Sequence, residues 1–160
     1  MISHWDEVEY SRRDRAHIGG TWASLTDDSS VTVGVTRMLI DPGKWSTPAH
    51  IENSEEEIFF VLAGSGLSWQ EGECYEVGPG DCLVHWPGAY SHTLRAGESG
   101  RIAHSFLAGD EALILLAYGT RDPNDVAYYL RSGKIYFRGV GLMARVEPLG
   151  YWNGEVDDGS

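Results

Sequence analysis

The sequence lacks the features that mark several large classes of protein. It has only two cysteines, Cys74 and Cys82, whose spacing gives neither a C-x-x-C pair nor a disulfide framework. This scarcity predicts a reduced chain in the cytoplasm. The longest apolar runs, residues 58–63 and 112–117, are too short to cross a bilayer as helices.

Basic residues are also scarce. The chain has 12 lysines and arginines against 24 acidic residues, which gives a formal net charge of -12. Nucleic acids and anionic membranes attract clusters of lysine and arginine, because phosphate groups dominate their surfaces. The sequence has no such cluster, so it predicts neither nucleic acid nor membrane as a partner.

No helical stripe of useful length is visible, and short β-like runs take its place. These runs are separated by turns rich in glycine about every 8–12 residues, a spacing typical of a sandwich or barrel. We expect an N-terminal extension over 1–30, with one or two helical turns within 7–16, and a barrel over 31–120. A C-terminal strand and tail over 121–160 would pack on the barrel or on a second subunit. Because Tyr151 and Trp152 in that tail are costly to expose, we predict a homodimer.

Residues 48–64 carry the strongest chemical signal. A polar segment containing His50, Glu52 and Glu57 leads directly into the apolar run 58–62, which Gly64 closes. The run is β-branched and aromatic, so it predicts a buried strand. Side chains at i and i+2 of a strand share a face, so His50 and Glu52 would point together into the interior. Imidazole and carboxylate groups at the edge of an apolar cavity are typical of a metal site.

A short repeat places two further histidines in equivalent positions. Residues 91–98 contain His92, and residues 103–110 contain His104, twelve positions later. Each copy predicts a strand that begins near the histidine and ends in a turn of alanine, glycine and an acidic residue. Either histidine could face the 48–64 stretch. His85, in the strand before, is interpreted as a core or rim residue.

These residues resemble the cupin superfamily. Its first motif is commonly written G-x5-H-x-H-x3,4-E-x6-G, and here Gly43, His50, Glu52, Glu57 and Gly64 follow that order, with Glu52 in place of the second histidine. Its second motif is commonly written G-x5-P-x-G-x2-H-x3-N. Gly80, Pro87 and His92 match this motif with one extra residue before the proline, and Ala96 replaces the asparagine.

The resemblance implies an all-β double-stranded β-helix, the cupin jelly-roll barrel, with irregular N- and C-terminal extensions. It also implies one divalent transition metal inside the barrel, held by His50, Glu52, Glu57 and His92. His92 is preferred over His104 because its distance from Gly80 and Pro87 fits the motif. A mixed set of nitrogen and oxygen ligands suits Mn, Fe, Ni, Co or Zn and does not choose among them.

Three functions follow from the resemblance. The first is a metal-dependent enzyme acting on a small polar molecule in the barrel, such as a sugar or sugar-phosphate isomerase, with Glu52 or Glu57 as catalytic proton acceptor. The alternatives are an iron dioxygenase of the cupin type and a non-catalytic binder of small molecules. Arg37, Arg95 and Arg101 could contact a substrate anion or could lie on solvated strand faces.

Overall fold

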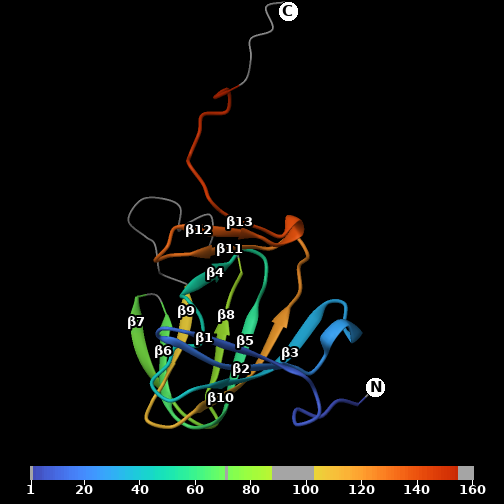
Figure 1. Cartoon of the computed structure of the whole chain (residues 1–160), viewed down its shortest axis with the longest axis vertical. Helices are drawn as coiled ribbons and strands as arrows, with labels where there is room; N and C mark the ends of the chain where they lie inside the picture. Colours follow the sequence, from blue (N-terminus) through green and yellow to red (C-terminus); the bar gives the residue numbers. More distant parts are fainter. Residues whose placement is uncertain (1, 71, 88–102, 155–160) are drawn as a thin grey trace, which may run out of the picture.

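The computed structural model describes residues 2–70, 72–87 and 103–154, which are almost entirely β (Figure 1). Two short 3-10 helices, η1 (Asp27–Ser29) and η2 (Arg138–Val140), accompany the strands. In this part of the chain, no helix has the length and apolarity needed to cross a bilayer. The strands are β1 (Tyr10–Arg15), β2 (Ile18–Ser24), β3 (Val33–Ile40), β4 (His50–Glu52), β5 (Glu57–Ala63), β6 (Gly66–Gln70), β7 (Glu73–Val77), β8 (Cys82–His85), β9 (His104–Ala108), β10 (Leu113–Thr120), β11 (Val126–Tyr129), β12 (Lys134–Phe137) and β13 (Leu142–Arg145).

The strands form two antiparallel sheets. The first sheet has the order β1-β2-β3-β10-β5-β8, and the second has the order β13-β12-β11-β4-β9-β6-β7. Neighbours such as β3 and β10 are far apart in the sequence, as expected when a chain winds back and forth between two sheets. This architecture confirms the predicted all-β jelly roll.

Strand β5 shows how the sequence pattern positions the interior. Phe59 and Val61 are buried, whereas Phe60 between them is exposed on the outer face. The strand is paired on both sides, with β10 and β8. Since alternate side chains share a face, Glu57 points to the same side as Phe59 and Val61. The predicted buried strand is therefore confirmed, and it carries a carboxylate into the interior.

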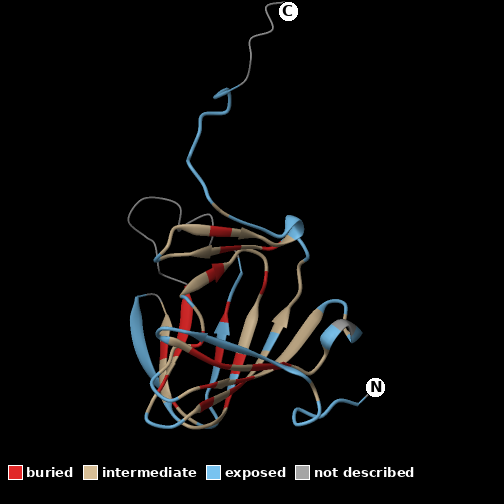
Figure 2. Ribbon diagram, in the orientation of Figure 1, coloured by how far each residue is buried: buried red, intermediate tan, exposed pale blue. Residues whose placement is uncertain are grey.

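The main hydrophobic core lies between the two sheets. Large fully buried side chains such as Phe106, Ile40 and Leu115 fill it, and a smaller cluster forms around Ile51 and Ala103. In Figure 2, the buried residues lie mainly on strands of the barrel, and β1 and the C-terminal segment are exposed. The core therefore fixes β5 and β9, which hold two of the site residues.

The two terminal regions extend the sheets. The helical turns predicted within 7–16 are wrong, because this segment contains β1, which pairs with β2 along its whole length. At the other end, β11 pairs with β4, and β12 and β13 follow as a meander. Beyond β13, residues 146–154 run away from the body of the molecule (Figure 1).

The predicted turns around the barrel are confirmed where the structure describes them. A hairpin spans residues 66–77, with β6 and β7 paired from Gly66↔Val77 to Gln70↔Glu73 across a turn that contains Gly72. Gly64 has a φ of +76°, and a Cβ there would come within 2.0 Å of the Ala112 carbonyl oxygen, so the close approach requires glycine. The second copy of the repeat forms β9. The first copy, with His92, lies outside the described residues.

Candidate metal centre

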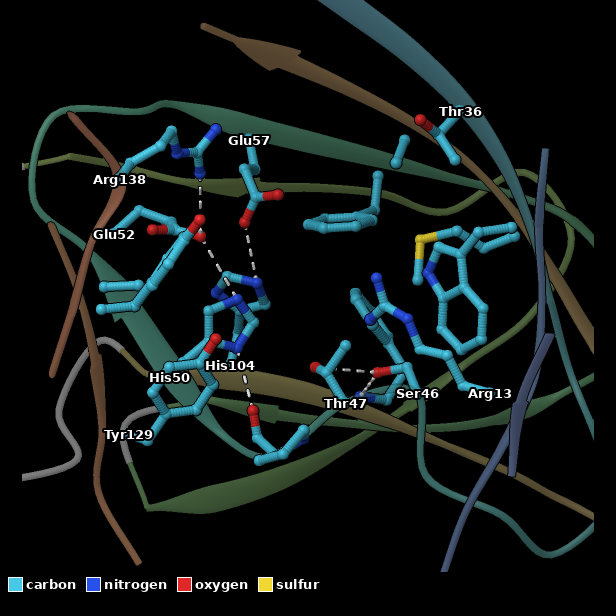
Figure 3. A pocket seen from close by; sticks show the side chains of 18 residues that line it. Arg13, Thr36, Ser46, Thr47, His50, Glu52, Glu57, His104, Tyr129 and Arg138 are labelled. Carbon is cyan, nitrogen blue, oxygen red and sulfur yellow. Dashed lines mark hydrogen bonds and ion pairs between the residues drawn. The ribbon is translucent and has the colours of Figure 1, made fainter. Parts of the chain in front are cut away.

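A cavity of about 290 Å³ lies between the sheets. One end is lined by the polar side chains of His50, Glu52, Glu57 and His104, as Figure 3 shows. Apolar side chains line much of the remainder, including that of Phe106. The volume is at the small end of the range for ligand pockets, so the cavity fits a compact molecule.

Three of these side chains come together as a possible ligand set. One ligand atom each from His50, Glu57 and His104 lies within 4.8 Å of the others. His50 and His104 are directly paired across β4 and β9, and Glu57 comes from β5 in the other sheet. The barrel therefore brings two imidazoles and a carboxylate together from opposite walls.

The His50 ring is held by the backbone. Its Nδ1 lies 2.9 Å from the carbonyl oxygen of Pro48. A carbonyl only accepts, so Nδ1–H is the donor, and in the neutral ring Nε2 keeps its lone pair. Metal-binding histidines are typically oriented by a hydrogen bond of this kind. His50 is therefore prepared to present Nε2 to a ligand in the cavity.

His104 is buried and supported by other rings. Its Nε2 lies 2.9 Å from Oε2 of Glu57. The His85 ring stacks on it at 4.1 Å between centroids, and the Phe59 ring lies 5.5 Å away. Burial, together with the charges of His104 and His50, lowers the pKa of His85 to about 3. His85 is therefore neutral and packs behind His104, as expected for a core histidine.

The surrounding charges favour ionised carboxylates here. Burial opposes charge on Glu57, but the field of His104 and contact with it lower the Glu57 pKa overall. Burial also opposes charge on His50, yet contact with Glu52 and the fields of both glutamates raise the His50 pKa. Both glutamates are therefore held in the ionised form that a cation requires, while a metal ion would have to displace the proton that the same field favours on His50.

Glu52 lies in the same cavity but in a second group. Its Oε1 is 3.4 Å from Nε2 of His50. Carboxylate oxygens of Glu52, Glu55 and Asp125 lie within 4.8 Å of one another, and Arg138 stands beside them. Arg138 Nη1 lies 2.8 Å from Oε1 of Glu55, and its Nη2 lies 3.9 Å from Oε1 of Glu52. The predicted shared face of His50 and Glu52 is confirmed, while the carboxylate of Glu52 also belongs to an ionic network behind the cavity.

The carboxyl group of Asp125 has a pKa well above that of an ordinary aspartate. It is completely buried, and its Oδ1 accepts a hydrogen bond from the Ser54 N–H at 2.7 Å. Burial and the neighbouring Glu52 carboxylate raise the pKa of Asp125 to about 7. The pKa of Glu52 is lowered to about 2, because contacts with His50 and Asp125 outweigh its burial. A proton shared between the two acids would satisfy Oε2 of Glu52 and Oδ2 of Asp125, which are buried without a hydrogen-bond partner among the described residues, although Nη2 of Arg138 lies 3.7 Å from Oδ2 of Asp125.

Replacing Asp125 by asparagine is expected to stabilise the metal-free protein, and the gain should grow between about pH 4 and pH 7. The folded chain retains the Asp125 proton up to a pKa of about 7, whereas the unfolded chain releases it near 3.8. The Asp125 carboxyl therefore contributes its full stabilisation to the wild type below the unfolded-state pKa of 3.8. That contribution is lost as the pH rises to the folded-state pKa of about 7. The asparagine amide would keep an acceptor for the Ser54 N–H and would not ionise.

The measurement is urea unfolding at several pH values. The difference in the free energy of unfolding between Asp125→Asn and wild type should increase by on the order of 2 kcal/mol across the interval. Asp110→Asn, at an exposed position, is the matched control and should track the wild type. A difference that stays constant from pH 4 to pH 7 would show that Asp125 does not hold its proton.

The donor set fits a divalent transition metal. Two imidazole nitrogens and one carboxylate suit Mn, Fe, Co, Ni or Zn, and the buried Oε2 of Glu57 faces Nε2 of His104 at 2.9 Å, so both groups point at the same place in the cavity. The structure brings His50, Glu52 and Glu57 into one cavity. His104, the alternative identified from the repeat, joins them. The prediction for His92 falls outside the described residues.

Three residues around this site were not identified from the sequence. Asp125 and Arg138 reach the site because β11 pairs with β4, with Ala127 opposite Glu52. Arg13 reaches the cavity from β1. No local motif marks any of them, because each contact depends on strands that are distant in the sequence.

Comparison with known proteins agrees with this geometry. The family model described as "Cupin domain" matches residues 36–107. A solved structure from Acidithiobacillus ferrooxidans, named for a sugar phosphate isomerase, is 26% identical, covers 91% of this chain and 92% of its own, and has a TM-score of 0.73. A structure from Silicibacter pomeroyi, named for a sugar phosphate isomerase of the cupin superfamily, is 21% identical, covers 93% and 96%, and also has a TM-score of 0.73. A Thermotoga maritima structure named for an oxalate decarboxylase is 20% identical, with coverage of 75% and 98% and a TM-score of 0.61. A search of curated proteins finds no significant match.

Proposed function

The chain carries a cupin domain over residues 36–107, and from this premise we propose that it is a metal-dependent isomerase of a small sugar or sugar phosphate. His50, Glu57 and His104 would hold one divalent ion. Glu52 would be the proton acceptor as part of its hydrogen-bonded pair with Asp125, because the pKa of Glu52 is about 2 and the more basic member of the pair, Asp125, has a pKa of about 7. The similarity to the Acidithiobacillus ferrooxidans protein supports this reaction class, since that protein is named for the same activity.

The position of Glu52 is the observation that carries the proposal. Its carboxylate lines the cavity beside His50 but stands outside the group formed by His50, Glu57 and His104. An aldose–ketose isomerase needs polarisation of a carbonyl oxygen and a separate base for the neighbouring carbon. A cavity with a ligand triad and one further carboxylate supplies both requirements in a small space.

A bound divalent ion would polarise the substrate carbonyl as a Lewis acid. Glu52 would remove the proton from the carbon next to that carbonyl, and the C–H electron pair would form the C=C bond of an enediol. Glu52 would then return the proton to the neighbouring carbon, and a hydroxyl proton would move between the two oxygens. The number of atoms and electrons is unchanged, as an isomerisation requires. Phe59 and Phe106 along the cavity would limit the entry of water.

Activity is tested with a panel of aldoses, ketoses and their phosphates. The protein is loaded with Mn, Fe, Co, Ni or Zn in turn, and each mixture is followed by proton NMR in deuterated water. The proposal predicts conversion of at least one sugar, with solvent deuterium entering at the carbon that receives the proton. Absence of conversion and of deuterium exchange with every metal and sugar would contradict the isomerase proposal.

A second function is favoured by the same ligand set. Two histidines and one carboxylate with open positions are the ligand type of non-haem iron oxygenases, and His50, His104 and Glu57 provide it. Oxygen consumption by the iron-loaded protein with candidate substrates separates this function from isomerisation. Stoichiometric oxygen uptake would favour the oxygenase, whereas conversion without oxygen would favour the isomerase.

We also propose that the chain forms a homodimer through its C-terminal segment, residues 146–154. Leu149, Tyr151 and Trp152 are 62%, 85% and 76% exposed in this segment, which extends away from the body. A groove of about 640 Å³ on the body is rich in apolar surface from Trp45 and Trp69. The segment from a second copy would fill this groove, since each chain offers both an unpacked apolar arm and an apolar recess.

The dimer is tested by sedimentation at micromolar concentration. Wild type is expected to sediment as a dimer, and the double variant Tyr151→Ala/Trp152→Ala should dissociate at least about tenfold more readily, since aromatic anchors dominate such contacts. Trp5→Ala, at a partly exposed aromatic outside the groove and segment, is the control. A monomeric wild type, or a dimer unaffected by the double variant, would contradict this arrangement.

A further inference from the structure

Arg13 places a positive charge at the cavity from β1, a strand whose residues are all exposed. It lies on β1, opposite Gly20 on β2, and its side chain is part of the cavity lining. In Figure 3, Arg13 lies at the opposite end of the cavity from Glu57 and His104. The guanidinium carbon is 4.2 Å from the ring centroid of Trp22, a side chain that is only 9% exposed. The indole therefore positions the cation at the cavity wall.

Arg13 differs from Arg12 and Arg138, which also lie near the cavity or its strand, in having no acidic partner among the described residues. Arg12 makes two contacts with Asp41, at 2.9 and 2.6 Å, and Arg138 lies 2.8 Å from Glu55. Arg13 forms neither an ion pair nor a hydrogen bond within the residues that the structure describes. Burial lowers its pKa, but a guanidinium remains charged at all physiological pH values. Its donors therefore remain open to a ligand and have no protein acceptor among the described residues.

An arginine without an acidic partner can bind an oxyanion with its free N–H donors. The planar guanidinium presents parallel N–H donors that match two oxygens of a phosphate or carboxylate. The protein carries a formal net charge of -12, so its overall field does not attract anions. A local positive group within the cavity would be needed to bind one. The apolar wall between the two ends would contact the carbon chain of such a ligand.

We propose that Arg13 binds the phosphate or carboxylate of a small anionic substrate whose reacting end lies at His50, Glu57 and His104. This inference rests on the proposed function and narrows it to substrates that carry an oxyanion at the end remote from the carbonyl. Arg13 would contact the substrate directly and set specificity. It would take no part in proton transfer.

The test uses inorganic phosphate and metal-free protein, so that the ion cannot bind a metal instead. Binding is followed by phosphorus NMR line broadening and by tryptophan fluorescence, at constant ionic strength. Wild type is expected to bind phosphate, and Arg13→Gln should bind at least about tenfold more weakly, the scale expected for charge-assisted hydrogen bonds. Arg12→Gln is the matched control and should stay within about twofold of wild type, because Arg12 is already paired with Asp41.

A conservative variant and a competing anion complete the experiment. Arg13→Lys keeps the charge without the planar fork and should give intermediate affinity. Acetate that displaces phosphate would show that carboxylates are accepted, whereas phosphate binding unaffected by acetate would indicate phosphate monoesters. Equal phosphate binding by wild type and Arg13→Gln, or no binding by wild type, would overturn the inference.

Metal content separates this inference from the proposed function. Arg13→Gln should retain the same metal content as wild type, because Arg13 is not among the candidate ligands. If neither protein binds metal but phosphate binding still depends on Arg13, the isomerase proposal fails and the anion site stands. If metal binds normally and phosphate binding does not depend on Arg13, the isomerase proposal stands and the anion site fails.

Discussion

Replacement of His104 by alanine is expected to lower the affinity for a divalent metal by at least about a hundredfold. The change removes one of three candidate ligands, and loss even of a residue that only orients a ligand commonly costs 10–100-fold. His50 and Glu57 alone would leave the ion largely hydrated. The measurement is a competition titration with a coloured chelator, carried out on the purified variant after metal removal.

His17→Ala is the matched control, since His17 is exposed and stands outside the ligand group. It should bind metal as wild type does. His92→Ala tests the other histidine of the repeat. Wild-type affinity in His104→Ala together with a large loss in His92→Ala would contradict the role given to His104 and support the histidine favoured by the motif spacing.

Replacement of Glu52 by glutamine is expected to lower the isomerisation rate by about 10²–10⁴-fold while the metal content stays unchanged, because it removes the proton acceptor. Glutamine has nearly the same shape and can still contact His50, so the cavity should persist. The rate is measured on the substrate found in the sugar panel, with metal content determined on the same sample. A decrease in turnover number without a large change in KM would show that Glu52 acts in the chemical step.

Glu56→Gln is the control for this change, since Glu56 is a nearby glutamate that does not line the cavity. It should retain wild-type turnover. Loss of metal together with activity in Glu52→Gln would make Glu52 a ligand, as the first motif suggests, and would exclude its assignment as a free base. Full activity in Glu52→Gln would move the role of proton acceptor elsewhere.

The direction in which individual site residues point along their own strands can be predicted from the sequence. The i, i+2 spacing places His50 and Glu52 on one face of β4. The same two-residue spacing on β5 turns Glu57 inward together with Phe59. The repeat identifies His104 as a candidate because its strand begins at the histidine. These predictions hold because strand periodicity is a local property that needs no knowledge of the pairing partners.

The rest depends on long-range pairing. Asp125 meets Glu52 only because β11 lies beside β4, and Arg138 joins them from the segment after β12. Arg13 lies in a strand whose residues are all exposed, so no apolar alternation distinguished β1 from a helical turn. Sheet register can bring charged groups together across the barrel, and a single sequence does not specify that register.

The most direct test of the central claim is metal analysis of protein purified without added metal, combined with thermal melting before and after chelation. The account predicts roughly one divalent ion per chain and a lower melting temperature once the ion is removed, since an ion bound only by the folded state stabilises it. Protein without stoichiometric metal, whose melting temperature does not change on addition of chelator or of Mn, Fe, Co, Ni or Zn, would contradict a metal centre at His50, Glu57 and His104.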